Sequence, residues 1–555
     1  MLLLGAATAS AHDFEVNGIY YNKNADGLSA TVTYKGDSYY AYNEYTGTVV
    51  IPASVTYSGN TYSVTTIGYG AFESCSGLTS IEIPTSVTTI GESAFYFCSG
   101  LTSVVMGNSV TTIGNYAFSE CRRLKSIVIP NSVTTIGESA FYFCSGLTSV
   151  SIGNSVTTIG GFAFSHCSGL TSVSIGNSVA EIGKDAFSEC RRLKSIVIPN
   201  SVTTIGESAF SYCGNLTAVE IPNSVTAIGD GAFRCCDGLE NIIVQSGNCI
   251  YDSRDNCNAI VETATNALLC GCKNTVIHNS VTAIGNYAFY GCSGLTSVVI
   301  PNSVTEIGNS AFDDCKNLAS VVIPNSVTTI GDRAFYLCLG LTAVSIGNSV
   351  TTIGEWAFSD CDKLTSVSIG NSVTKIGKSA FSGCSGLTSV SIGNSVATIG
   401  ESAFSYCDKL TSVSIGNSVT KIGKSAFYFC SRLTSVTSLN TIPPIANFST
   451  FDVVPSSCVL YVPDGSVEAY RVAEGWSRFT NFKTLPVGVE DVDADAVTVR
   501  GENGVIRIDG AEGAAVEVYN AAGVCVYSGT ADEVPVPQRG IYVVKVAGRA
   551  TKLAL

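Results

Sequence analysis

The chain has 555 residues, of which 45% are hydrophobic and only 13% are charged, and its net charge is −14. Such an acidic chain is repelled by nucleic acid and by anionic lipid, and we expect neither as a partner. No apolar run reaches the roughly 18 residues that a membrane-spanning helix needs, so we expect no transmembrane helix.

Residues 1–11 form a short apolar run that ends in an A-x-A motif. Small residues after an apolar run are typical of a secretory signal peptide, and we expect the mature chain to begin near His12. No basic segment precedes the run, which leaves open a natural start further upstream. The next segment, 12–63, is rich in Tyr, Thr and Gly and predicts a β-rich N-terminal cap.

From 64 to 436 the chain repeats a unit of 23 residues. In the unit 132–154, Val150 and Ile152 point to one face and the intervening serines to the other, which is the period of a short strand. Before this strand, Gly137 and an A-F-x-x-C segment predict a turn or a short helical segment that carries the chain back. The phenylalanines that mark the fifteen units are Phe72, Phe95, Phe118, Phe141, Phe164, Phe187, Phe210, Phe233, Phe289, Phe312, Phe335, Phe358, Phe381, Phe404 and Phe427.

A single unit buries too few side chains to offset the conformational entropy that it loses on folding. Stacked units share their apolar faces and a ladder of backbone hydrogen bonds, and a fixed period between about 20 and 50 residues is typical of such stacks. The pattern therefore predicts a repeat solenoid of short parallel β-strands joined by turns or short helical segments.

The consensus L-x-S-V-x-I-P-N-S-V-T-x-I-G-x-x-A-F-x-x-C-x-x-L resembles the 23-residue leucine-rich repeat of BspA-like bacterial surface proteins, the treponemal type. It departs from the commonest leucine-rich pattern, because no asparagine occupies the usual ladder position and a cysteine takes an interior place. The resemblance implies a solenoid with a parallel sheet along one side. It also implies adhesion, since BspA-like proteins are associated with binding to host extracellular-matrix proteins and with cell–cell attachment.

The period is interrupted at 245–280, between Phe233 and Phe289. This insert resembles the hairpin-bearing atypical repeat of the same family, and we expect it to widen or bend the solenoid. Five of its residues could suggest a metal site, but their C-x12-C-x-C spacing fits no zinc pattern well and an arginine interrupts the carboxylates. We expect no metal at these positions, which are Asp252, Asp255, Cys257, Cys270 and Cys272.

After the last repeat, 437–485 resembles the closing unit of such solenoids, in which a final strand and helix place Trp476 over the last core layer. The acidic segment 486–496 predicts a solvated linker. Short alternating runs separated by Gly, Asn and Asp every 8–12 residues or so predict a small β-sandwich over 497–555.

The end of this last segment resembles the C-terminal sorting domain of type IX secretion. The resemblance implies export across the outer membrane of a Bacteroidetes cell, with the type IX secretion machinery as a partner and display at the cell surface. The residues that carry this sorting signal are Gly540, Tyr542, Val544, Lys545, Val546 and Lys552.

Fifteen of the 22 cysteines lie three residues after a repeat phenylalanine. Cysteine at a tight interior place behaves as a small apolar residue, and a parallel stack points all these side chains the same way, so we expect reduced, buried thiols. We expect the remaining cysteines to form disulfides, without a connectivity that spacing can resolve. They are Cys235, Cys249, Cys257, Cys270, Cys272, Cys458 and Cys525.

Catalytic chemistry finds little support in the sequence. The three histidines, His12, His166 and His278, combine with no recognisable nucleophile. The chain has neither a P-loop nor a dinucleotide-binding fingerprint. We therefore expect neither enzymatic activity nor a cofactor.

Two surfaces of the predicted solenoid could bind a partner. The outward strand positions, such as Ser149 and Ser151, form a flat and nearly uncharged strip. Aromatic and basic residues recur instead between the repeat phenylalanine and the next leucine, and such residues dominate interface hot spots. The candidate binding residues of this region are Tyr96, Phe97, Arg122, Arg123, Lys125, Tyr142, Phe143, Arg191, Arg192 and Lys194.

An alternative is that these rings pack between units while the cations balance an acidic shell. We expect a monomeric protein, secreted or associated with the outer membrane at the cell surface, that binds matrix or cell-surface proteins of a host. Glycan binding or processing is a second possibility, although processing would need a carboxylate pair in a cleft with aromatic platforms. An inert spacer is a third.

Overall fold

The computed structural model describes most of the chain, and the larger of its two compact units holds Met1–Tyr461 and Glu468–Phe482. The smaller unit holds Val462–Val467 and Lys483–Leu555. The predicted signal peptide and linker lie outside the described residues. Those residues are 12–35, 45–485, 498–502, 505–509, 515–520, 525–530, 533–536, 541–546 and 549–554.

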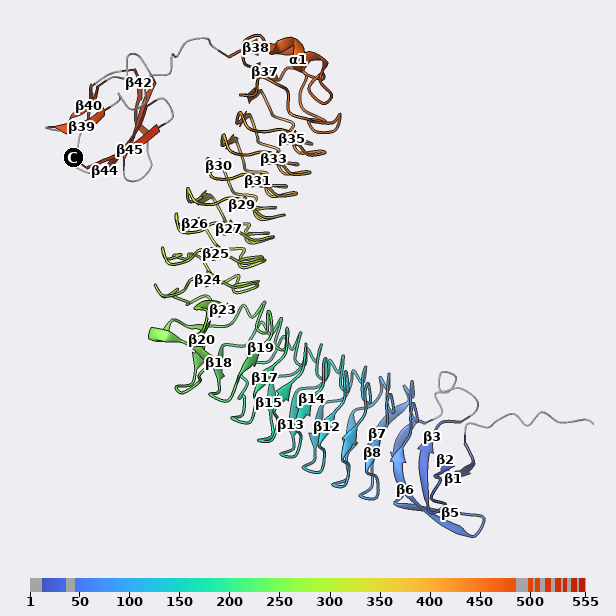
Figure 1. Cartoon of the computed structure of the whole chain (residues 1–555). Helices are drawn as coiled ribbons and strands as arrows, with labels where there is room; N and C mark the ends of the chain where they lie inside the picture. The colour runs from blue at the N-terminus through green and yellow to red at the C-terminus, as the bar shows by residue number, and fades with distance from the viewer. Residues whose placement is uncertain are drawn as a thin grey trace, which may run out of the picture. The chain divides into compact units, whose positions relative to one another are not determined.

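The larger unit is a solenoid of parallel strands, as the 23-residue period predicts (Figure 1). On one side, each repeat contributes a two-residue strand that pairs in parallel with the equivalent strands of the preceding and following repeats. Thr135, for example, pairs with both Thr112 and Thr158. The first sheet on this side contains β1 (Phe14–Val16), β2 (Ile19–Lys23), β3 (Ser29–Thr33), β5 (Ser54–Tyr57), β6 (Asn60–Ile67), β8 (Thr89–Ile90), β10 (Thr112–Ile113), β12 (Thr135–Ile136), β14 (Thr158–Ile159), β16 (Glu181–Ile182), β17 (Thr204–Ile205) and β19 (Ala227–Ile228). The second contains β21 (Tyr251–Asp252), β22 (Ala259–Glu262), β23 (Ala267–Gly271), β24 (Ala283–Ile284), β25 (Glu306–Ile307), β27 (Thr329–Ile330), β29 (Thr352–Ile353), β31 (Lys375–Ile376), β33 (Thr398–Ile399) and β35 (Lys421–Ile422).

The second side of the solenoid carries the strands in which buried and outward residues alternate. In β13 (Ser149–Ile152), Val150 and Ile152 are buried at 3% exposure each, as the alternation predicts. The other strands of this side are β4 (Gly47–Val50), β7 (Leu78–Glu82), β9 (Ser103–Val105), β11 (Ser126–Ile129), β15 (Ser172–Ser174), β18 (Ala218–Ile221), β20 (Asn241–Val244), β26 (Ser320–Val322), β28 (Ala343–Ser345), β30 (Ser366–Ile369), β32 (Ser389–Ile392), β34 (Ser412–Ile415), β36 (Ser435–Ser438), β37 (Val459–Val462) and β38 (Asn481–Thr484).

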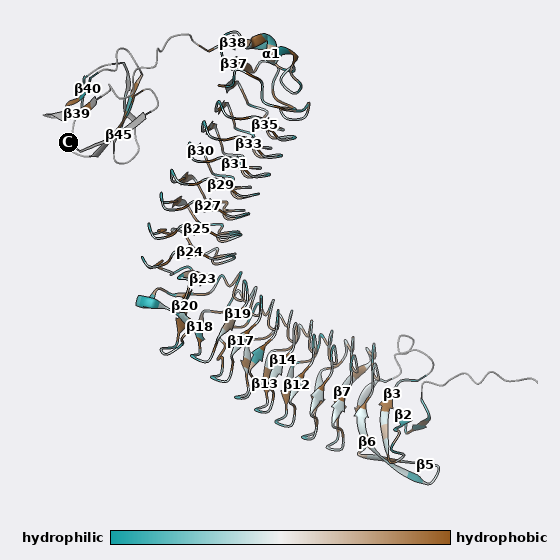
Figure 2. Cartoon of the chain, viewed as in Figure 1, coloured by the Kyte–Doolittle hydropathy of each residue, from teal (hydrophilic) through white to brown (hydrophobic). Residues whose placement is uncertain are grey.

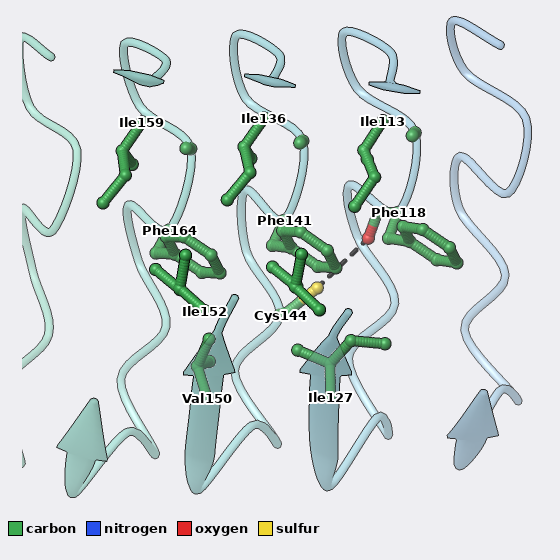
Figure 3. Close-up of a cluster of buried hydrophobic side chains, with 14 of the residues drawn as sticks. Ile113, Phe118, Ile127, Ile136, Phe141, Cys144, Val150, Ile152, Ile159 and Phe164 are labelled. Carbon is green, nitrogen blue, oxygen red and sulfur yellow. Dashed lines mark hydrogen bonds between the residues drawn. The ribbon is translucent and has the colours of Figure 1, made fainter. Parts of the chain in front are cut away.

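The repeat phenylalanines form a stack of rings through the interior. Neighbouring rings of each stack are nearly parallel, at 1–7°, and their centroids lie 4.8–5.4 Å apart. Figure 3 shows Phe118, Phe141 and Phe164 in this arrangement, with a row of isoleucines on one side. Each ring is covered by the rings of the adjacent turns, which is why a single unit could not exist alone.

The segment after each repeat glycine forms turns and not a helix, because two of its residues are left-handed. In the turn 137–144, Ser139 and Phe143 have φ values of 54° and 56°. Left-handed residues stop a helix, and here they direct backbone N–H groups toward the next unit. Phe141 N donates to the carbonyl oxygen of Ala163 at 2.7 Å, so the turns add a third hydrogen-bonded ladder to those of the two sheets.

Polar side chains continue these ladders along the surface. Thr134 Oγ1 donates to the carbonyl oxygen of Thr111, one repeat earlier, at 3.2 Å. At the P-N-S or G-N-S corner, Asn131 Oδ1 accepts the N–H of Asn154 at 2.8 Å. An asparagine ladder therefore exists at a place different from the usual one, and the sequence analysis missed it.

The repeat cysteines are buried thiols, as predicted. Cys144 Sγ donates to the carbonyl oxygen of Phe118, in the preceding turn, at 3.1 Å (Figure 3). The prediction that the other cysteines form disulfides is wrong for Cys235, Cys249, Cys257, Cys270, Cys272 and Cys458, which are free. Five of these six sulfurs have a backbone carbonyl as a hydrogen-bond acceptor, among them Gly247 for Cys249 and Glu240 for Cys272. The side chain of Cys525 is outside the described residues.

The insert interrupts the stacks of the larger unit. Its hairpin, β22–β23, is antiparallel and restarts the parallel ladder by pairing β23 with β24. The hydrophilic 3₁₀ turn η1 (Arg254–Asn256) projects from it, coloured teal in Figure 2. One backbone bond, from Cys235 N to the carbonyl oxygen of Tyr290 at 2.8 Å, joins the turns on either side.

Aromatic side chains cover both ends of the solenoid. Tyr45 lies 4.5 Å from the ring of Phe72, the first of the stack. At the other end, Phe451 continues the stack beyond Phe427, and the fully buried Trp476 lies 4.9 Å from it. The helix α1 (Val467–Val472) precedes this tryptophan. Among the described residues, no helix is long and apolar enough to cross a membrane.

The smaller unit contains two antiparallel sheets. A small core from both sheets includes Ile506, Val518 and Val544, which is the arrangement of the predicted β-sandwich. Of the sorting-signal residues, Val544 and Val546 are buried, and Lys545 Nζ lies 5.2 Å from the Tyr519 ring centroid. Tyr542 and Lys552 lie in strands, and Gly540 is outside the described residues. The strands are β39 (Thr498–Glu502), β40 (Val505–Asp509), β41 (Val516–Asn520), β42 (Cys525–Gly529), β43 (Glu533–Pro535), β44 (Ile541–Val546) and β45 (Arg549–Ala554).

Candidate functional site

The residues that vary most between repeats lie in one column along the turns. This variable column is the second residue after each repeat phenylalanine, and its φ is left-handed in every turn of the stacks, between 54° and 73°. Because its N–H bonds forward, as from Phe143 to Ser165 at 2.9 Å, its side chain lies at the edge of the turn. The column contains Ser74, Phe97, Glu120, Phe143, His166, Glu189, Tyr212, Cys235, Gly291, Asp314, Leu337, Asp360, Gly383, Tyr406 and Phe429.

Four consecutive turns of this column border a groove of about 690 Å³, which we call the arginine groove. Its two ends come from the identical segments 119–125 and 188–194, both SECRRLK. The two turns between them carry Ser-Gly where the ends carry Arg-Arg, so the middle is hollow. The lining residues are Arg122, Phe143, Ser145, His166, Ser168, Gly169, Glu189, Arg191 and Arg192.

An ion pair of the same geometry holds the arginine at each end of the arginine groove. Arg122 Nε lies 2.6 Å from Glu120 Oε2, and Arg191 Nε lies 2.6 Å from Glu189 Oε2. The glutamates are only 14% and 16% exposed, whereas the arginines are 55% and 69% exposed. Each glutamate raises the pKa of its arginine through this hydrogen bond, so both guanidinium groups stay charged.

The floor of the groove is a pair of stacked rings. Phe143 and His166 lie 4.2 Å apart at 5°, and the guanidinium carbon of Arg122 lies 5.9 Å from the Phe143 centroid, on the side of the preceding turn. Tyr142 meets the His166 ring edge-on at 5.5 Å. His166 therefore covers one face of Phe143, and the guanidinium group of Arg122 lies over the other face without stacking on it.

The structure brings together only some of the predicted binding residues. Arg122, Phe143, Arg191 and Arg192 line the groove. Tyr142 borders it through its ring contacts, while Arg123, Lys125 and Lys194 are exposed beside it. Tyr96 and Phe97, whose centroids are 5.8 Å apart, belong to the turn before Glu120 and line no part of it.

Sequence analysis assigned no binding role to three residues that line or border the groove. Glu120 and Glu189 precede the arginines by two residues, and His166 occupies the repeat position of Phe143. Phe143 and His166 are one period apart in the chain, and this spacing was the sequence signal from which their stacking could have been predicted. As the alternative expected, the Phe143 ring packs against a ring of the next unit, and acidic side chains pair with Arg122 and Arg191. Both arginines nevertheless remain largely exposed.

The outward strip of the strand side, predicted to be flat, is hollowed. A depression of about 840 Å³ lies over β9, β11 and β13. Ser103, Ser126, Ser151 and the exposed Val105 and Val128 line part of it. It carries no charged side chain, and so it has little with which to orient a partner.

The insert contains a chain of hydrogen bonds that the sequence analysis missed. His278 Nε2 lies 2.8 Å from Asp255 Oδ2, and His278 Nδ1 lies 2.8 Å from Ser280 Oγ. The order resembles a hydrolytic triad, but Nδ1 also accepts the backbone N–H of Ser280 at 3.1 Å, which weakens it as a base for the hydroxyl. Arg254 Nη1 donates to the same hydroxyl at 2.7 Å, so the contacts connect η1 to the stack.

The two carboxylates considered for a metal site are each engaged by a neighbouring side chain. Asp252 binds Arg254 at 2.8 Å, and Asp255 binds His278. Across the described part of the chain, no group of three or more His, Cys, Asp or Glu side chains is arranged to hold a metal ion.

The chain is similar to bacterial leucine-rich repeat proteins. It matches the family model of the BspA type leucine rich repeat region over 53–171, 139–258, 266–369 and 351–452. A leucine-rich repeat protein from Bacteroides ovatus is 33% identical, with 73% of this chain and 94% of that chain covered and a TM-score of 0.53. A leucine rich cell surface protein from Faecalibacterium prausnitzii is 32% identical, with 72% and 93% covered and a TM-score of 0.50.

A third solved structure, a leucine-rich repeat protein from Eubacterium ventriosum, is 27% identical over 55% of this chain and 83% of that chain, with a TM-score of 0.51. No curated protein matches the chain.

Proposed function

Because this chain belongs to the BspA-type leucine-rich repeat family, we propose that it is a surface-displayed binding protein that adheres to matrix or cell-surface proteins of a host or of other cells. Repeat solenoids present extended surfaces, and their usual role is to bind proteins. We assign the adhesive contact to the arginine groove and assign no enzymatic activity or cofactor to the chain.

The observation that carries this proposal is the pair of exposed arginines, Arg122 and Arg191, at the two ends of one groove. Each is held by a largely buried glutamate, so its orientation is set before a partner arrives. Preorganised side chains lose less conformational entropy on binding, and arginine beside aromatic rings is typical of interface hot spots. No comparable charged arrangement occurs in the depression on the strand side.

Glycan binding is the second candidate, and the contacts of the Phe143 ring argue against it at the arginine groove. Sugars pack on exposed aromatic faces, whereas Phe143 has His166 on one face and Arg122 on the other. Glycan processing would need a pair of carboxylates in a cleft. The groove carboxylates, Glu120 and Glu189, are each paired with an arginine and lie three turns apart.

We further propose that the smaller unit directs export by type IX secretion, which would place the solenoid outside the cell. The β-rich fold of 498–554 and the exposed Lys545 support this role. Transplanting 497–555 onto a periplasmic reporter in a Bacteroidetes host would test it. Surface exposure of the reporter is expected, and a reporter that remains in the periplasm would contradict it.

A binding screen tests the adhesive role. The full chain would be immobilised and exposed to matrix proteins, cell-surface proteins and glycans, with binding measured by biolayer interferometry. We expect a protein partner whose affinity falls at least tenfold in the R122S/R191S variant. We also expect its affinity for the unchanged chain to fall when salt is added. The control is R432S, an exposed arginine in another turn, at the repeat position of Arg123 and Arg192. Binding to glycans alone, or turnover of a glycan, would overturn the proposal.

A further inference from the structure

We infer that the arginine groove holds an extended segment of a protein partner with acidic side chains at positions i and i+4. This inference rests on the proposed function, and it specifies the chemistry of the partner. It follows from three properties of the groove, which are its charge, the atoms that its arginines leave unused and the distance between its ends.

The charge of the groove is opposite to that of the chain. The two SECRRLK segments contribute six cations and two glutamates, an excess of four positive charges on a chain of net charge −14. Arg123, Lys125, Arg192 and Lys194 are exposed. An acidic partner is therefore attracted here and repelled by most of the remaining surface.

The glutamates leave the terminal nitrogens of both arginines unused. Glu120 and Glu189 each accept from Nε. Among the described residues, no protein group accepts a hydrogen bond from Nη1 or Nη2 of Arg122 or Arg191. A guanidinium group held in this way presents its two Nη groups as a fork, which matches a carboxylate in a bidentate arrangement.

The distance between the ends selects an extended polypeptide. Arg122 and Arg191 lie three turns apart, which at the spacing of parallel strands is about 14 Å. Four residues of an extended chain rise about 13 Å, and residues i and i+4 point to the same side. A segment lying along the solenoid axis would thus place one carboxylate on each arginine. Residues i and i+3 point to opposite sides and could not do so.

The middle of the groove, between the two arginines, has room for such a segment. Ser145, Ser168 and Gly169 occupy the turns between the arginines, and their side chains are the smallest available there. The hydroxyl groups of the two serines can bond with a peptide backbone. A sulfated glycan also carries anions, but its rings would find one face of Phe143 stacked on His166 and the guanidinium group of Arg122 over the other. We therefore favour the peptide and treat the glycan as an outcome of the test.

The test uses fluorescence anisotropy with the full chain and labelled Thr- and Val-rich peptides that favour the extended form. One peptide has glutamates at i and i+4, a second has them at i and i+3, and a third has glutamine at both positions. A sulfated heparin-type oligosaccharide is the fourth probe. We expect the i,i+4 peptide to bind at least tenfold more tightly than the other two peptides, and more tightly than the oligosaccharide.

Variants connect this binding to the two arginines. R122S and R191S should each weaken the i,i+4 peptide about tenfold, while R432S should leave it unchanged. R122K/R191K keeps the charge but loses the fork, and it should also weaken binding if the arginines act as forks. Because lysine at both positions preserves charge and length, this variant keeps the test decisive even where the serine variants fold poorly.

Three results would overturn the inference. They are equal binding of the i,i+4 and i,i+3 peptides, preference for the oligosaccharide, and unchanged peptide binding in R122S/R191S. Protein partners found in the wider screen would then still support adhesion through another surface. Failure of the adhesive role is separately recognised by the absence of any protein partner in that screen.

Discussion

Ser310 Oγ donates a hydrogen bond to Asp313 Oδ2 at 3.2 Å, and the aspartate is only 2% exposed. Other turns place a buried serine at this position, for example Ser165 and Ser211. Burial raises the pKa of Asp313 to about 7, and the bond from Ser310 and the charge of Arg333 oppose this shift only in part. The fold therefore favours the neutral carboxyl group.

The first prediction concerns the pH dependence of stability at Asp313. The pKa of Asp313 is near 4 in the unfolded chain and higher in the folded protein. Below pH 4 the carboxyl group is protonated in both states and does not lower the free energy of unfolding. Between pH 4 and pH 7 the unfolded chain ionises more readily, so the free energy of unfolding falls as the pH rises. The variant D313N should stabilise the protein at pH 8 by up to about 3 kcal/mol and change it little at pH 4. Chemical unfolding at the two pH values measures this difference.

The control for this measurement is the neighbouring Asp314. Its carboxylate pairs with Lys316 at 3.1 Å near the surface, and removing such a pair changes stability by less than about 1 kcal/mol. D314N should therefore show a small change at pH 8. A gain for D313N that is equal at pH 4 and pH 8 would contradict the raised pKa.

The second prediction tests the close approach of repeat glycines. A Cβ atom on Gly354 would lie 2.5 Å from the carbonyl carbon of Gly331 in the adjacent turn. The backbone there cannot give way without opening the ladder, so G354A should destabilise the protein by about 1–3 kcal/mol. On Gly370 the nearest atom would be Asn348 Oδ1 at 3.7 Å, and G370A should change stability by less than about 0.5 kcal/mol. Equal urea midpoints for the two variants would disprove the argument.

The third prediction concerns the thiols. Burial raises the pKa of the Cys213 thiol to about 12 and raises those of most other repeat cysteines, so they should not react with Ellman's reagent at pH 8. Cys249 is the one exposed cysteine of the described residues. In a C525S background we expect one rapidly reacting thiol, which C249S removes, and release of the others only in guanidinium chloride. Several rapid thiols in the native protein would show that the interior is accessible.

The fourth prediction compares the two tryptophans of the chain. Trp476 is fully buried against Phe451 and donates from Nε1 to the carbonyl oxygen of Pro444 at 2.8 Å. W476A should cost about 3–5 kcal/mol, and hydrogen exchange should increase first in the last turns, because each turn is covered only by its neighbours. W356A, which removes a half-buried ring 6.4 Å from Tyr336, should cost less. Loss of protection spread evenly over the solenoid would argue against the capping role.

The fold was predictable because the buried residues of its interior recur with one short period. The phenylalanines and the alternating pair Val150 and Ile152 repeat every 23 residues, and parallel stacking is the arrangement that buries them all. The conformation of the turns was less predictable. Aromatic residues such as Phe143 rarely adopt a left-handed φ, and only the hydrogen bond to the next turn explains it here.

The groove was predictable in its parts and not in its geometry. Both arginine clusters stand out in the sequence, and their three-repeat separation is visible there. The roles of Glu120 and His166 depend on side-chain directions that a repeat pattern does not contain. The contact of Asp255 with His278 lies in the insert. The insert does not follow the 23-residue repeat, so the sequence pattern does not predict which of its residues lie next to one another. For the same reason, spacing could not show that the cysteines of the insert remain unpaired.

The hydrogen bond from most repeat thiols to the preceding turn has a consequence for how the chain folds in an oxidising medium. Before neighbouring turns close, up to 22 sulfurs are accessible, and random oxidation would trap the chain in wrong disulfides. Closing one turn on the next brings together residues only about one period apart, and such local contacts form fast. The order of events is then a kinetic competition, in which the speed of stacking protects the sulfurs from oxidation.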